Sequence, residues 1–261
     1  MARNEARLIP LQDGQGSEAT VYVKGFLGAG EEPQHFDRWF RGHRSLVDSH
    51  SWGATAHGWS WSAGNWASIP VPVASGAKLA VDVYRSLRYA RLSALGVTAG
   101  LAVAEVGARF AGQYLAAERQ ATEQSEALAV QLCELARRHQ RVRVVAHSLG
   151  CRQVVEAVAS LAVEDRPSDI HLCAPAFVEE VVSDKLGSLA REKTYLYYAP
   201  GDLVLSVAFP LIAWDRPLGV AAPQGEYAGL TSIDVSPHFG FRVHGEYKNR
   251  FADFVGHPEA I

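Results

Sequence analysis

Ser148 stands where an apolar run rich in β-branched residues, 141–147, gives way to small residues that open a helix-like segment. A serine between a strand and a helix is lifted above the edge of the sheet. The backbone N–H of the next residue then turns toward the place where an oxyanion would form. The pattern predicts a nucleophile elbow at Ser148 and acyl-transfer chemistry, with the Leu149 amide as one oxyanion donor. A serine that merely caps a helix is the alternative interpretation.

The pentapeptide around this serine, residues 146–150, reads Ala-His-Ser-Leu-Gly and departs from G-x-S-x-G at its first position. Alanine is the smallest replacement for glycine there. Gly150 keeps the other small position, which lets the following helix lie close to the strand. Residues 149–163 read as that helix, with an apolar stripe that includes Val154, Val155 and Val158.

A serine hydroxyl needs a base and an oriented acid before it becomes a strong nucleophile. Residues 193–199 are strand-like, and Pro200-Gly201 breaks this strand immediately before Asp202. An acid just past the carboxyl end of a parallel strand lies at the same rim of the sheet as the elbow. Asp202 is therefore the predicted acid, with a simple turn residue as the alternative and Asp234 as the rival acid.

Two histidines follow the next short strand, residues 231–235. Only His244 leads straight into a helix-like stretch, residues 246–255, and it is the predicted base. His238 is the rival, because geometry and not spacing decides such assignments. His147, beside the serine, is expected to shape the surroundings of the elbow instead of acting as the base.

The second oxyanion donor should come from the loop after an early strand. Residues 20–24 read as that strand, and the glycine-rich segment 25–30 follows it at once. The Phe26 amide is the predicted partner of the Leu149 amide, with Leu27 as the fallback. The loop lacks the Gly-Lys-Ser/Thr ending and the G-x-G-x-x-G spacing of nucleotide-binding loops, which disfavours a nucleotide ligand.

With serine, acid and histidine in this order, the chain resembles the α/β-hydrolase superfamily from about residue 20 to its end. The chain is also similar, more narrowly, to a poorly characterised hydrolase-like family with membrane-associated members of unassigned activity. The segments that carry this similarity are Gly25-Phe26-Leu27, the elbow, 198–205, and 233–236 followed by His244. The resemblance implies the fold and the triad positions but no substrate.

The length, net charge and cysteine and histidine content of the chain limit the classes of function that it can have. The chain has 261 residues, which suits one large α/β domain spanning 1–261, and its formal net charge of −3 provides no basic field for nucleic acid. Three cysteines, Cys133, Cys151 and Cys173, form no C-x-x-C pair and are expected to be buried free thiols. The histidines show no zinc-ligand spacing, so neither a metal nor another cofactor is expected.

Residues 66–120 exceed what a minimal hydrolase needs and are predicted to be a helical insertion or cap. Five of the six tryptophans fall within residues 39–66, and residues 59–62 alternate like a strand. Residues 78–117 read as helical, and packing of this helical material against the sheet is favoured over contact with a membrane surface. The apolar run 92–104 is too short to cross a bilayer. Residues 1–7 do not resemble a signal peptide, which predicts a cytoplasmic protein.

Further elements complete the expected fold. Residues 121–139 read as the helix that leads into the elbow strand, and residues 168–173 as another strand. Alternation of strands and helices at these lengths predicts a mostly parallel central sheet flanked by helices, the α/β-hydrolase fold.

The favoured hypothesis is a serine esterase or lipase-like hydrolase acting on a small-molecule or lipid ester of apolar acyl character. The same groups would serve a thioesterase, an amidase or an acyltransferase. The alternative from another class is a non-catalytic hydrolase-fold protein that binds a lipid or a protein partner.

Overall fold

The computed structural model describes residues 6–26, 32–63, 111–210, 215–240 and 243–255. Within these residues a seven-stranded sheet has the order β1-β3-β2-β4-β5-β6-β7. Strand β1 is antiparallel to β3, and the other neighbouring pairs are parallel. The strands are β1 Arg7–Gln12, β2 Glu18–Val23, β3 Thr55–Ser60, β4 Arg141–His147, β5 Asp169–Cys173, β6 Lys193–Tyr198 and β7 Leu230–Asp234. The predicted mostly parallel sheet is confirmed.

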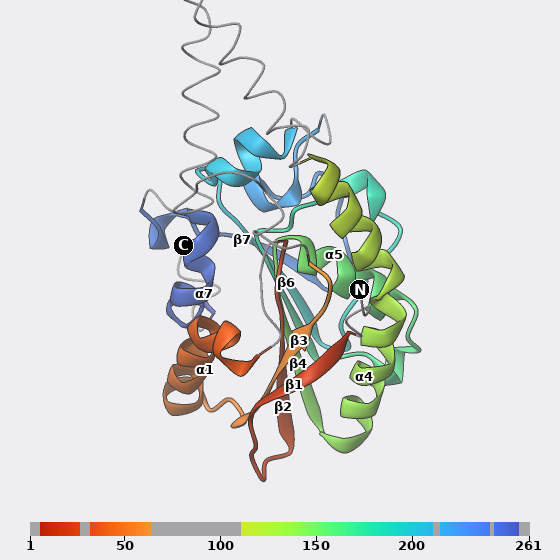
Figure 1. Ribbon diagram of the computed structural model, residues 1–261, viewed down its shortest axis with the longest axis vertical. Helices are drawn as coiled ribbons and strands as arrows, with labels where there is room; N and C mark the ends of the chain where they lie inside the picture. Colours follow the sequence, from red (N-terminus) through yellow and green to blue (C-terminus); the bar gives the residue numbers. More distant parts are fainter. Residues whose placement is uncertain (1–5, 27–31, 64–110, 211–214, 241–242, 256–261) are drawn as a thin grey trace, which may run out of the picture.

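Helices cover both faces of this sheet (Figure 1). Helices α1 and α7 lie together on one side, and α4 and α5 lie together on the other. The bounds are α1 Asp37–His50, α4 Ser125–Arg138, α5 Leu149–Ala159 and α7 Val243–Phe254. Short 3-10 turns occupy Pro33–Phe36, Val163–Asp165, Glu179–Val181, Leu218–Val220 and Ser236–His238, and a π-helical turn occupies Val204–Ala208. The chain therefore forms a three-layer α/β structure.

The periodicity of the sequence explains which side each helix presents to the sheet. In α4, Leu128, Leu132 and Leu135 recur at helical spacing and are buried. In α1, Trp39, His43 and Leu46 follow the same spacing and are also buried. Burial of one apolar stripe against the sheet supplies most of the stability of such helices.

Several boundaries differ from those expected. Residues 111–123 form a helix of their own that ends in a turn at residue 124, so α4 begins later than residue 121. Helix α5 ends at Ala159 instead of residue 163, and the Ser160 hydroxyl donates a hydrogen bond back to the Ala157 carbonyl oxygen. Strand β1 contains Pro10, which lacks an N–H for a sheet ladder and is tolerated because β1 is an edge strand.

The predicted insertion at residues 66–120 falls mainly outside the described residues, which leave out 64–110. Residues 111–120 belong to the helix that ends at residue 123. The alternating segment around Trp59 forms the end of β3, and Trp59 and Trp61 are buried in the core. Trp66 lies outside the described residues.

The sheet face under α1 and α7 carries buried polar groups among aromatic rings. The Arg143 guanidinium forms an ion pair with Glu18 and lies 4.7 Å from the centre of the Trp52 ring. On β5, His171 Nδ1 lies 2.9 Å from the Tyr197 hydroxyl. Burial, reinforced by the positive charge of Arg143, lowers the pKa of His171 to about 3. His171 is therefore a neutral core residue at ordinary pH.

Candidate active site

Ser148 lies at the sharp turn between β4 and α5. Its backbone has φ 54° and ψ −126°, and a positive φ at a residue with a side chain is strained. The Ser148 N–H donates to the Cys173 carbonyl oxygen at 2.9 Å, and the Ser148 carbonyl oxygen accepts from the Ala176 N–H at 3.3 Å. The end of β5 and the loop after it thus hold the strained turn in place.

Two glycines allow the turn to sit tightly against the end of β2. A Cβ on Gly150 would lie 2.5 Å from the Lys24 carbonyl oxygen. A Cβ on Gly25 would lie 2.6 Å from Ser148 Cβ and 2.7 Å from the His147 carbonyl oxygen. Ala146, the residue that departs from the glycine pattern, is fully buried within β4. The small residue at the first position is therefore accommodated inside the strand, whereas Gly25 and Gly150 make the close approach.

The structure brings Ser148, His244 and Asp202 into one chain of hydrogen-bonding distances. His244 Nε2 lies 3.2 Å from Ser148 Oγ, and His244 Nδ1 lies 2.7 Å from Asp202 Oδ2. These residues follow β4, β7 and β6, whose carboxyl ends meet at one edge of the parallel sheet. Because a carboxylate only accepts hydrogen bonds, the proton of neutral His244 belongs on Nδ1, which leaves Nε2 free to accept the serine proton.

The surroundings of Asp202 favour a fixed carboxylate. Its side chain is completely buried, and its Oδ1 accepts the backbone N–H groups of Val204 at 3.0 Å and Leu205 at 3.2 Å. These two amides belong to the beginning of a helical turn, where N–H groups have no partner within the helix. With His244 on Oδ2, each oxygen of the carboxylate has a donor. Asp202 therefore holds the imidazole in one orientation.

The rival acid Asp234 and the rival base His238 have other partners. Asp234 ends β7, and its Oδ1 accepts the N–H of Ser236 at 2.8 Å. His238 lies in the 3-10 turn after β7, where its ring packs against Phe254 at 5.7 Å between centres. In the described part of the chain, neither is placed within hydrogen-bond distance of Ser148. The geometry favours His244 and Asp202.

The two predicted oxyanion donors come from separate elements. Leu149 is the first residue of α5, so its N–H has no acceptor within the helix. Phe26 follows β2 at the loop that Gly25 begins, and its ring contacts Tyr114 edge to face with 5.6 Å between centres. Leu27 and the rest of the glycine-rich loop through residue 30 lie outside the described residues. The donor roles of Phe26 and Leu149 remain predictions.

The structure gives His147 a specific partner within the site. Its Nε2 lies 2.8 Å from the backbone carbonyl oxygen of His244, and the two rings lie 4.7 Å apart between centres. Burial lowers the pKa of His147 well below its usual value, and the neighbouring charges of His244 and Lys248 lower it further. His147 is therefore a neutral neighbour of the predicted base.

Tyr114 is a residue that sequence reasoning missed. It lies on the helix at 111–123, and its hydroxyl donates to the carbonyl oxygen of Ala176, the residue whose N–H holds the Ser148 carbonyl. Its ring also contacts Phe209 edge to face at 5.7 Å between centres. No local motif marks this tyrosine, because its partners lie far away along the chain. Tyr114 therefore packs against Phe26 and Phe209 and ties its helix to the loop that holds Ser148.

Cys173 contributes its backbone carbonyl oxygen to the turn at Ser148, but its side chain and those of Cys133 and Cys151 are free thiols. All three are free, and Cys151 and Cys173 are buried, with burial raising the pKa of both thiols well above the usual value. The expectation that every cysteine is buried is wrong for Cys133, which is only partly buried because α4 presents it toward a surface hollow. Raised pKa values make Cys151 and Cys173 poor nucleophiles.

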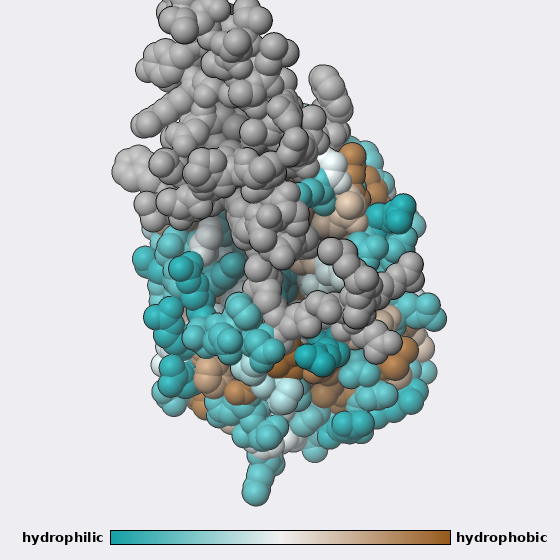
Figure 2. Space-filling view, viewed as in Figure 1, coloured by the Kyte–Doolittle hydropathy of each residue, from teal (hydrophilic) through white to brown (hydrophobic). Residues whose placement is uncertain are grey.

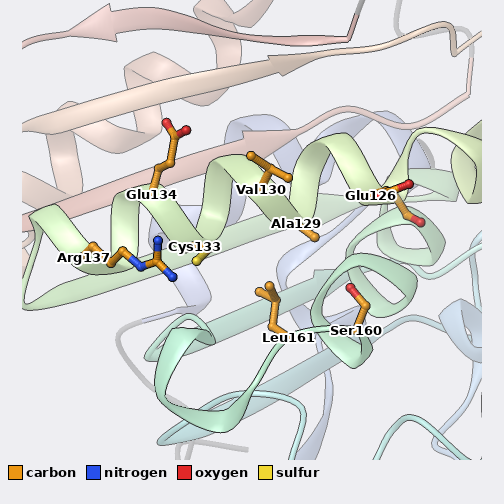
Figure 3. A pocket seen from close by; sticks show the side chains of 9 residues that line it. Glu126, Ala129, Val130, Cys133, Glu134, Arg137, Ser160 and Leu161 are labelled. Carbon is orange, nitrogen blue, oxygen red and sulfur yellow. The ribbon is translucent and has the colours of Figure 1, made fainter.

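That hollow lies between α4 and the far end of α5 (Figure 3). Its lining includes Val130, Arg137 and Leu161, and it begins at the opposite end of α5 from Ser148. An 11-residue helix is roughly 16 Å long, so the hollow is remote from the elbow. In Figure 2, polar and apolar residues are mixed over the coloured lower part of the visible face.

Within the described ranges, no three His, Cys, Asp or Glu side chains gather in a way that could hold a metal ion. No helix in the same ranges has the length and apolar character needed to cross a membrane.

Comparison with known families gives one clear match. The model of the family described as "Alpha/beta hydrolase of unknown function (DUF900)" matches residues 104–237, which is 134 of the 261 residues. The matched region contains the elbow and Asp202, while His244 lies just beyond it. No curated protein matches the chain.

Among solved structures, the chain is similar to the apo form of Thermogutta terrifontis esterase 2, with 12% identity and a TM-score of 0.37. A propionate-bound form of an esterase from the same organism gives 12% identity and a TM-score of 0.38. Each comparison covers 95% of this chain and 87% of the other. Scores at this level do not establish a common fold, so the fold assignment depends on the family match and on the sheet topology.

Proposed function

The chain belongs to a family of alpha/beta hydrolases of unknown function, and on that premise we propose that it is a serine hydrolase that cleaves a carboxylic ester. The observation that carries the proposal is the line of contacts from Asp202 through His244 to Ser148, with distances of 2.7 and 3.2 Å. These three residue types in this arrangement activate an alcohol for attack on a carbonyl carbon.

In the proposed first step, His244 Nε2 accepts the proton of Ser148 Oγ while this oxygen attacks the ester carbonyl. Asp202 stabilises the imidazolium that forms, through the bond to His244 Nδ1. The amides of Phe26 and Leu149 donate to the oxyanion of the tetrahedral intermediate. His244 then returns the proton to the departing alcohol, which leaves an acyl group on Ser148.

In the second step, His244 takes a proton from water, and the resulting hydroxide attacks the acyl-enzyme. Collapse of the second tetrahedral intermediate releases the acid and returns the proton to Ser148. The aromatic rings of Tyr114 and Phe26, near the turn at Ser148, support an apolar acyl group as part of the substrate. A thioester, an amide or transfer of the acyl group to another acceptor would use the same residues. We retain residues 66–120 as a proposed insertion within one domain, 1–261.

A fluorophosphonate probe tests the proposal, because it phosphonylates a serine only when a base activates that serine. We expect the wild-type protein and the control Ser160→Ala to be labelled and Ser148→Ala to remain unlabelled. Ser160 is a fair control because it lies at the other end of the same helix. If the folded wild-type protein resists labelling and hydrolyses no ester of any chain length, the proposal that it is an enzyme is refuted. That result would favour a non-catalytic binding protein.

A second comparison tests the base. His244→Ala should abolish hydrolysis of a short-chain ester, whereas His238→Ala should leave most of it. Loss of turnover in the His238 variant alone would overturn the assignment of His244. A series of esters of graded chain length would then define the acyl preference of the wild-type protein.

A further inference from the structure

His147 is the last residue of β4 and lies directly before Ser148 in the chain. The ring of His147 is buried and packs against His244, with 4.7 Å between ring centres. Trp39 of α1 and Tyr247 of α7 lie on other sides of it, at 6.1 and 6.0 Å between centres. His147 therefore occupies the space between the elbow and the helix that carries the predicted base.

The hydrogen bond of His147 can run in only one direction. Its Nε2 lies 2.8 Å from the backbone carbonyl oxygen of His244, and a carbonyl oxygen only accepts hydrogen bonds. The Nε2 atom must therefore carry a proton and donate it. Because burial lowers the pKa of His147, the ring is neutral, and its Nδ1 carries no proton.

We propose that His147 is a positioning residue for the base, which fixes the backbone of His244 through the Nε2–H bond. This inference rests on the proposed function of Ser148, His244 and Asp202. A carbonyl oxygen has two lone pairs, so that of His244 can accept from His147 and still serve the first turn of α7. The bond links the strand that presents the nucleophile to the helix that presents the base.

The geometry of the base shows why this link matters. The distance from His244 Nε2 to Ser148 Oγ is 3.2 Å, already at the long end of a hydrogen bond. Asp202 holds the far side of the ring through Nδ1, a contact with the side chain of His244 and not with its backbone. A displacement of about 1 Å at a reacting group can lower a rate by roughly 10²-fold. The bond from His147 resists that displacement from the side of the nucleophile.

The neutrality of His147 also suits the proposed reaction. His244 becomes an imidazolium while it holds the serine proton, and a second positive charge beside it would oppose that step. A lysine or an arginine at position 147 could supply a donor but would add this charge. The neutral imidazole of His147 supplies a hydrogen-bond donor without adding a positive charge beside His244.

Two substitutions of His147 distinguish the role of its hydrogen-bond donor from the role of its ring as a packing group. His147→Phe keeps a planar ring and places a carbon where Nε2 lies. His147→Gln places an amide N–H2 the same number of bonds from Cβ as Nε2, so it keeps a neutral donor. The matched control is His171→Phe, which makes the same change at a buried histidine on β5 that bonds to Tyr197 and contacts none of the triad residues.

The rate of hydrolysis of a short-chain ester and the thermal midpoint should be measured for all three variants. We expect His147→Phe to lower kcat by about 10- to 100-fold with little change in KM, because positioning acts in the transition state. His147→Gln should recover most of that loss. His171→Phe should lower the thermal midpoint as much as His147→Phe does while keeping wild-type kcat.

A second measurement does not require turnover. In protein with ¹⁵N-labelled histidine, the His244 Nδ1 proton bonded to Asp202 should give a downfield resonance in the wild type and in His147→Gln. The same resonance should be broadened or lost in His147→Phe, because the ring of His244 then moves. Absence of catalysis in the wild type would refute the proposed function, while this resonance would still decide whether His147 positions His244.

Three outcomes would overturn the inference. Wild-type kcat and an unchanged resonance in His147→Phe would show that the bond has no role in positioning. Equal loss in the Phe and Gln variants would show that the imidazole ring matters and not its donor. An equal fall of kcat in His171→Phe would show that loss of stability alone explains the effect.

Discussion

Gly25 offers the sharpest test of how the elbow is held, because its backbone lies so close to Ser148 that no side chain fits between them. An added Cβ would lie 2.6 Å from Ser148 Cβ and 2.7 Å from the His147 carbonyl oxygen. Ordinary van der Waals contact begins at 3.4 Å, which is 0.8 Å farther than the first of these distances. In Gly25→Ala the two backbones must therefore separate by nearly 1 Å.

The expected size of the effect follows from this displacement. A shift of about 1 Å at the nucleophile corresponds to a loss of roughly 10²-fold in kcat/KM. Overpacking of a rigid contact should also lower the free energy of unfolding by about 1–3 kcal/mol. The loss of activity should exceed what reduced stability explains, since a protein that remains folded at the assay temperature still has a displaced serine.

The assay compares rates of fluorophosphonate labelling and of ester hydrolysis in the wild type, Gly25→Ala and the control Gly187→Ala. A Cβ at Gly187 meets no atom within 4 Å, so the control should behave as the wild type. Labelling of Gly25→Ala within about threefold of the wild-type rate would refute the reasoning, because a displacement of the active nucleophile should slow its attack much more.

Two further predictions concern Asp202 and His171. In Asp202→Asn, the amide oxygen should still accept hydrogen bonds from the N–H groups of Val204 and Leu205, and the amide NH₂ should face His244 Nδ1. This would force the proton onto Nε2, so kcat should fall by about 10⁴-fold with the fold intact, and a kcat near the wild-type value would contradict the role of Asp202. His171 has a pKa of about 3 in the folded protein, so only the unfolded chain takes up its proton as the pH falls below about 6.5. The free energy of unfolding should therefore fall by about 2 kcal/mol between pH 7 and pH 5 on account of His171 alone. Urea titrations at the two pH values should show a smaller fall in His171→Gln, and an equal fall in both proteins would contradict this assignment.

Features that arise from neighbours along the chain could be predicted from the order of the residues alone. The apolar run before Ser148, the Pro200-Gly201 break before Asp202 and the helical segment after His244 are local signals. They predicted which residues follow which strands, and the rule that parallel strands share a carboxyl edge placed all three together. The strand β4 before Ser148 was predicted for the same reason, since a short run rich in β-branched residues is a strong signal for a strand.

Contacts between groups that are distant along the chain became known from the folded arrangement. His147 contacts the carbonyl oxygen of a residue 97 positions away, and Tyr114 donates to one 62 positions away. Such contacts depend on the order of the strands, on their register and on how α7 packs against β4. The tight fit at Gly25 arises in the same way, because the sequence shows a glycine but not the backbone that lies against it. Local propensities act over a few residues, whereas these contacts exist only after the sheet and its helices have assembled.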